Sequence, residues 1–125
     1  MESLLLMSQE NSAGSDSPQR LLKLMSLLQQ KHEATPLTIS QLFHQIIELS
    51  RKGHPFYGFK TGKWISGNQE FTLSSDGFIS DLGLLETLAY IQIDKLRETI
   101  QLLPPGENAS GRVKLEEPIM SLLKR

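Results

Sequence analysis

Apolar residues recur at helical spacing near the start of the chain. Ser17 is a good N-cap, and Pro18 suits the first helical position, where its missing N–H would have no partner. A wide apolar stripe follows, made of Leu21, Leu22, Leu24, Met25, Leu27 and Leu28. The pattern predicts a first helix that ends before Pro36, because the residue preceding a proline is disfavoured in the helical conformation.

A second helix is predicted between Thr38 and Gly53. Thr38 and Gln41 have the T-x-x-Q spacing of a capping box. Leu37 and Leu42 stand at the positions that form a hydrophobic staple. The apolar stripe consists of Leu42, Phe43, Ile46, Ile47 and Leu49. Gly53 stands where a left-handed residue commonly ends a helix.

Beyond Gly53 the pattern becomes typical of strands. Phe56, Tyr57 and Phe59 are strand-prone, and Phe71 and Leu73 alternate with polar residues. The pattern predicts a β-hairpin over roughly residues 56–73, with a turn at 66–68.

The last third of the chain predicts several short elements. Ser74 or Ser75 caps a third helix, whose inward face we expect to contain Phe78, Ile79, Leu82, Leu85, Leu88 and Ala89. Residues 90–93 are expected to be extended, and Asp94 is expected to cap a short helix over 95–103 with Leu96 facing inward. A loop at 106–111, a strand at 112–115 and a helical turn from Pro118 to Arg125 complete the prediction.

The predicted fold is therefore α+β and helix-dominated. We expect a winged-helix-like bundle of three to five helices with a small antiparallel β-hairpin. A length of 125 residues with 38% hydrophobic and 22% charged residues suits one domain with a modest core. We assign residues 18–125 to a single globular domain and residues 1–17, which are rich in small polar side chains, to a flexible lead-in.

Composition also bears on the compartment. The chain has no cysteine, which excludes disulfides and thiolate zinc sites and favours a reducing, cytoplasmic environment. The early apolar run Leu4–Met7 is too short for a secretory signal, and no apolar run approaches the ~18 residues of a transmembrane helix.

Catalysis has little support in the sequence. There are three histidines, and no G-x-S-x-G motif gives any of them the context of a catalytic triad. His44 and Glu48 share a helix face, but no further ligand stands at a diagnostic metal-binding spacing. The glycines do not form a phosphate-binding loop. We therefore expect no enzyme activity, no metal site and no cofactor.

The segment 51–66 holds the clearest candidate chemistry. It contains four of the eight aromatic residues and no acidic residue. Cations can neutralise phosphates while aromatic rings stack on bases, so the candidate nucleic-acid contacts are Arg51, Lys52, Lys60, Lys63 and Tyr57. In the alternative interpretation, the aromatic rings form the core of the hairpin and the cations line its wet face. Arg51 and Lys52 also suit the end of a helix through its dipole.

The predicted third helix argues against binding DNA in the usual winged-helix manner. In helix-turn-helix domains this helix reads the major groove. Here no Lys or Arg occurs at residues 65–93, whereas Glu70, Asp76, Asp81 and Glu86 are acidic and would be repelled by phosphates. The formal net charge of −1 likewise disfavours a dominant, non-specific nucleic-acid binder.

A hydrophobic pattern in the middle of the chain resembles Panacea-type and related winged-helix-like regulatory domains. The matching residues are Tyr57, Phe59, Ser80, Asp81, Leu82, Leu85 and Ile91. The Gly-Pro that usually precedes the serine is missing, and residues 75–78 stand near its place. The resemblance implies a regulator or an antitoxin-like binding module.

We therefore expect a non-enzymatic regulatory domain, with a DNA-binding transcription regulator as the first candidate. The alternative is a protein-interaction adaptor or inhibitor that does not bind DNA. A protein partner or a homodimer is expected in either case, and the apolar segments 4–7 and 119–123 are candidate dimer surfaces.

Overall fold

The computed structural model describes residues 17–32, 36–66 and 69–123. These residues form an α+β fold with small antiparallel sheets, in which helices predominate, as predicted. In chain order, the elements are α3 (Ser17–His32), β1 (Leu37–Thr38), α4 (Ile39–Arg51), β2 (Lys60–Ser66), β3 (Gln69–Ser74), α5 (Asp76–Thr87), β4 (Ile91–Asp94), β5 (Thr99–Leu102), α6 (Pro104–Ser110) and α7 (Glu117–Leu123). The predicted lead-in, apart from Ser17, lies outside the described residues.

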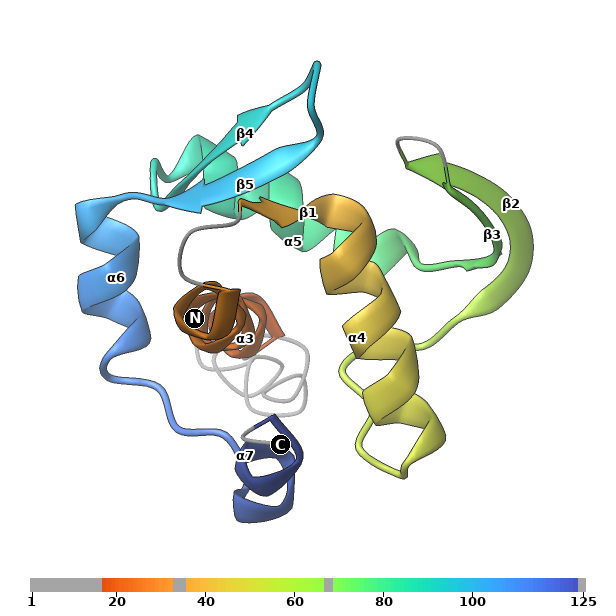
Figure 1. Cartoon of the computed structure of the whole chain (residues 1–125), viewed down its shortest axis with the longest axis horizontal. Coiled ribbons are helices and arrows are strands. Elements are labelled where there is room, and N and C mark those ends of the chain that lie inside the picture. The colour runs from red at the N-terminus through yellow and green to blue at the C-terminus, as the bar shows by residue number, and fades with distance from the viewer. Residues whose placement is uncertain (1–16, 33–35, 67–68, 124–125) are drawn as a thin grey trace, which may run out of the picture.

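Helix α3 is the centre of the fold. Figure 1 shows it end-on, with α4 on one side, α6 on the other and the three-stranded sheet above. That sheet has the order β1-β5-β4, and both pairings are antiparallel. The predicted hairpin is confirmed as β2–β3, which forms a separate two-stranded sheet beside α4. Its first strand begins at Lys60, so residues 56–59, predicted to be extended, lie outside the strands.

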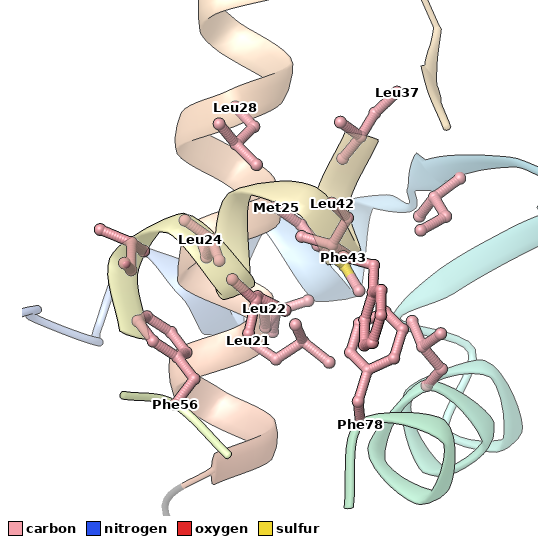
Figure 2. Close-up of a cluster of buried hydrophobic side chains, with 14 of the residues drawn as sticks. Leu21, Leu22, Leu24, Met25, Leu28, Leu37, Leu42, Phe43, Phe56 and Phe78 are labelled. Atoms are coloured by element: carbon pink, nitrogen blue, oxygen red, sulfur yellow. The ribbon is translucent and has the colours of Figure 1, made fainter. Parts of the chain in front are cut away.

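The core joins α3 and α4 to the sheet and to α5. Figure 2 shows leucines of α3, Leu42 and Phe43 of α4 and the rings of Phe56 and Phe78 gathered in one cluster. Helix α4 buries the whole stripe that the sequence predicted, and α3 buries its own apart from Leu27, which is only partly buried. Residues at helical spacing share one face, which explains both stripes. Fully buried members include Leu21, Leu22, Leu24, Met25, Leu37, Leu42, Phe43, Ile46, Leu49, Phe78, Leu85, Ile91 and Ile119.

The two ends of α4 confirm the sequence signals. Thr38 Oγ1 accepts the N–H of Gln41 at 3.0 Å, and Gln41 Oε1 accepts the N–H of Thr38 at 3.0 Å. At the other end Gly53 has φ 90°, and the N–H of His54 bonds back to the carbonyl of Leu49 at 2.8 Å. This geometry is a Schellman ending, which requires a residue in the left-handed region.

The helix predicted over 95–103 is wrong. The chain instead makes a hairpin, β4–β5, in which the Asp94 carboxylate accepts the N–H groups of Leu96 and Arg97 at 3.0 and 3.2 Å. Asp94 therefore caps a turn and not a helix, a role for which aspartate is equally suited. Leu96, predicted to face inward, lies at the tip of this turn and is 98% exposed.

Two further predictions fail near the C-terminus. The expected loop at 106–111 is mostly helix α6. Pro104 and Pro105 occupy the first turn of this helix, where a backbone N–H has no partner within the helix and proline is therefore tolerated. The expected strand at 112–115 is irregular chain. The final helix was predicted correctly and extends to Leu123, with residues 124 and 125 outside the described part.

Candidate functional site

The aromatic rings of the 51–66 segment lie mainly in the core. The Phe43 ring on α4 is 4.4 Å from the Trp64 ring and 5.8 Å from the Phe59 ring, between centroids. Phe56 is 7% exposed and lies beneath the Arg20 guanidinium, which is 4.3 Å from its ring centroid. Packing therefore accounts for most of these rings, as the second interpretation of this segment expected.

Tyr57 belongs to a partly buried hydrogen-bond network and not to an open stacking surface. Its hydroxyl donates to Asp81 Oδ2 at 2.6 Å, and the hydroxyl of Ser17 donates to the same oxygen at 2.6 Å. Burial is the main reason that the pKa of Tyr57 is raised well above 10.0, and its hydrogen bond to Asp81 adds to the shift. The Asp81 carboxylate of α5 therefore holds both the start of α3, through Ser17, and the neutral hydroxyl of Tyr57.

Replacing Tyr57 by phenylalanine is expected to lower the free energy of unfolding by about 1–2 kcal/mol, because buried Asp81 loses a donor. In the native protein, Tyr57 keeps a proton that the unfolded chain releases near its ordinary pKa of 10.0. The stabilisation that protonated Tyr57 contributes is therefore complete below about pH 10 and declines as the pH rises above that value. Urea unfolding between about pH 9 and 11 checks this slope.

Tyr90→Phe is the matched control, because the Tyr90 hydroxyl makes no hydrogen bond with the described residues. It should keep the decline of stability with pH. An equal slope in Tyr57→Phe and in the unmodified protein would contradict the role given to this network.

The predicted cations are exposed, and three of them have carboxylate partners. Arg51 pairs with Glu48 at 2.8 Å. Lys60 pairs with Asp76 at 2.9 Å, and Lys63 pairs with Glu70 at 3.2 Å. Lys52 makes no ion pair within the described residues. In the folded protein, carboxylates from outside residues 51–66 therefore pair with the cations of this segment. The segment itself contains no acidic residue, so these ion pairs are not evident from its sequence.

The solvent side of α5 is the least expected surface. Its inward face consists of Phe78, Asp81, Leu82 and Leu85. Ile79, Leu88 and Ala89, predicted to face inward, are all exposed, Ile79 by 47% and Leu88 by 50%, and Leu84 is 44% exposed. We call the exposed side the α5 outer face; its residues are Ile79, Ser80, Gly83, Leu84, Thr87 and Leu88. It presents apolar flanks around small residues and carries no cation.

A groove lies beside the leucine flank of this face. Its volume is about 740 Å³, and its walls come from the first turns of α3, the end of α5 and the segment after α6. We call it the α3–α5 groove. Leu84, Leu88 and Tyr90 give it apolar walls, and Arg112 and Lys114 give it positive charge. The sequence does not reveal this groove, because the residues that form its walls are far apart along the chain.

The described part of the chain contains neither a cluster of metal ligands nor a membrane-spanning helix. Within residues 17–32, 36–66 and 69–123, no three His, Asp or Glu side chains gather as metal ligands. No helix in those ranges is long and apolar enough to cross a membrane. Comparisons with protein-family models, curated proteins and solved structures give no match.

Proposed function

We propose that this protein is a non-enzymatic binding module of winged-helix-like architecture, and that the α5 outer face docks a protein partner. The order of elements supports the architecture. Apart from β2–β3, the chain runs α3, β1, α4, α5 and then the β4–β5 hairpin. The second strand of this hairpin, β5, pairs with β1. On this assignment β4–β5 is the wing, and β2–β3 is an insertion between the second and third helices.

The exposed side chains of α5 carry the functional part of the proposal. A helix that reads DNA needs cations and hydrogen-bond donors toward the groove. At the corresponding position α5 offers Ile79, Leu84 and Leu88, each close to half exposed. Leu84 and Leu88 are four residues apart and therefore adjacent on the surface, whereas Ile79 lies at the opposite edge of the face. Adjacent exposed apolar side chains of this size are typical of protein interfaces. Gly83 lies between the flanks with open space where a side chain would begin, so a partner can approach closely.

DNA binding through the hairpin side is the second candidate. Lys60 and Lys63 have side chains that are 64% and 71% exposed. Exposed ion pairs contribute only about 0–1 kcal/mol each, so phosphates can compete for these lysines. With Arg51, Lys52 and Tyr57, they are the contacts that this candidate requires; the hydrogen bond of Tyr57 to Asp81 makes it the weakest of them.

The double variant Leu84→Glu, Leu88→Glu tests the α5 outer face. We expect it to remain folded, because both side chains are already exposed, and to lose at least about tenfold in partner capture by in-cell crosslinking. Ile65→Glu is the matched control, because Ile65 is 61% exposed on β2 and does not belong to the α5 outer face. Capture that is equal in all three proteins would contradict the proposal.

A titration with random duplex DNA at low salt separates the two candidates. Protein docking by α5 predicts no salt-sensitive DNA binding. Salt-sensitive binding that weakens in Lys60→Ala, Lys63→Ala, with a salt slope lower by roughly one unit per lost contact, would favour the second candidate.

A further inference from the structure

We infer that the α3–α5 groove binds an acidic, apolar peptide segment of the partner that docks on α5. This inference rests on the proposed function and names the chemistry of the partner. The groove is continuous with the α5 outer face, because Leu84 and Leu88 belong to both. Its volume of about 740 Å³ is large enough for a few peptide side chains.

The walls favour aliphatic or aromatic side chains. Leu84 and Leu88 approach from the end of α5, and Tyr90 follows them at the start of the turn into β4. The N–H of Tyr90 bonds to the carbonyl of Leu85 at 3.0 Å, which fixes the direction in which the chain leaves the helix. Apolar side chains of a peptide gain free energy by covering these partly exposed groups.

The charges around the groove favour an acidic peptide. Three cations line it, Arg20, Arg112 and Lys114, against a single carboxylate, Glu116. Arg20 and Glu116 pair at 3.1 Å, so each largely neutralises the other. Arg112 and Lys114 are exposed and make no ion pair with any described residue. The remaining charge is positive and complements carboxylates, whereas a basic peptide would be repelled.

The segment that carries these cations is held in place, although it is irregular chain. The N–H of Arg112 bonds to the carbonyl of Ala109 at 3.2 Å, and that of Val113 bonds to the carbonyl of Ser110 at 3.1 Å. One residue beyond Lys114, the side chain of Leu115 is 7% exposed and joins the core. The two cations are therefore presented at a defined position, which reduces the entropy lost on binding.

Selection from a random-peptide display library on the immobilised full chain tests this inference. We expect the enriched peptides to combine apolar residues with Asp or Glu and to carry net negative charge. Binding of a fluorescent enriched peptide should weaken at least about tenfold in Arg112→Glu, Lys114→Glu, because attraction becomes repulsion. Lys31→Glu, Lys52→Glu is the control, since it makes the same change in net charge at exposed positions that do not line the groove.

Each other outcome overturns the inference. Enrichment of basic peptides, no enrichment, or equal weakening in the two charge variants would contradict an acidic ligand in this groove. DNA binding that is lost in Arg112→Glu, Lys114→Glu would make the groove a nucleic-acid site instead. Peptides that lose affinity in Leu84→Glu, Leu88→Glu but not in the groove variant would refute the inference and leave docking on α5 intact.

Discussion

Replacing Gly106 by alanine is expected to destabilise the protein by about 3 kcal/mol, because the added carbon has no space. A Cβ at this position would lie 2.1 Å from the carbonyl oxygen of Tyr90 and 2.9 Å from its carbonyl carbon. Both are backbone atoms, so no flexible side chain can move aside. The same carbonyl accepts the N–H of Leu103 at 3.0 Å, so its displacement would also strain the junction of β5 and α6.

Two other glycines provide controls for the Gly106 variant. Gly111→Ala adds a carbon whose nearest contact is 3.5 Å away, an ordinary separation, and should leave stability within about 0.5 kcal/mol. Gly83 lies within α5, and the carbon added by Gly83→Ala would point into open space. This variant should raise stability by about 0.5–1 kcal/mol, because alanine is the better helix former. Urea midpoints at neutral pH rank the three variants. Equal midpoints for Gly106→Ala and Gly111→Ala would refute the close contact.

The contact of Gly106 also bears on the groove. Tyr90 lines the α3–α5 groove, and α6 leads directly into the segment that carries Arg112 and Lys114. A shift of α6 away from Tyr90 would move one wall of the groove relative to another. Peptide affinity should therefore fall in Gly106→Ala even under conditions in which the variant is still folded.

Local chemistry explains which parts of the fold were predictable from sequence. Both ends of α4 follow from Thr38, Gln41 and Gly53, because capping and left-handed endings involve neighbours in the chain. Asp94 was ambiguous, since an aspartate can cap a helix or a turn. Residues 99–102 form a strand that pairs with β1, where Ile100 stands opposite Leu37, a residue far away in sequence. That contact is invisible to a local pattern, and so is the one that requires glycine at 106.

The same limit applies to the candidate site. The six apolar positions assigned to the third helix extend over about half of its circumference, with Ile79 and Leu88 at opposite edges, and the core covers only part of that arc. Only the position of α5 against α3 and β4 decides that Phe78 is buried and Leu88 is exposed. The positive charge of the groove was equally hidden. Arg112 and Lys114 meet the end of α5 only after the chain has passed through β4, β5 and α6.

Replacing Phe43 by alanine is expected to lower the free energy of unfolding by about 3–5 kcal/mol. Its ring is 1% exposed and is 5.0 Å from the rings of both Phe71 and Phe78, between centroids. With Trp64 at 4.4 Å, it joins the β2–β3 hairpin to α4 and α5. The variant leaves a cavity at this junction, and the rings around it cannot close in because each belongs to a different element.

The hairpin should respond to this change more than the rest of the fold. Apart from the aromatic cluster, β2–β3 is held by hydrogen bonds such as that from Ser66 Oγ to Glu98 Oε1, at 2.6 Å. Trp64 is the only tryptophan and reports directly on the hairpin. Its fluorescence should shift toward that of exposed tryptophan in Phe43→Ala at urea concentrations where the far-ultraviolet circular dichroism is still native. Phe43→Leu, which retains most of the buried volume, should keep the two transitions together; coincident transitions in Phe43→Ala would show that the hairpin does not depend on this ring.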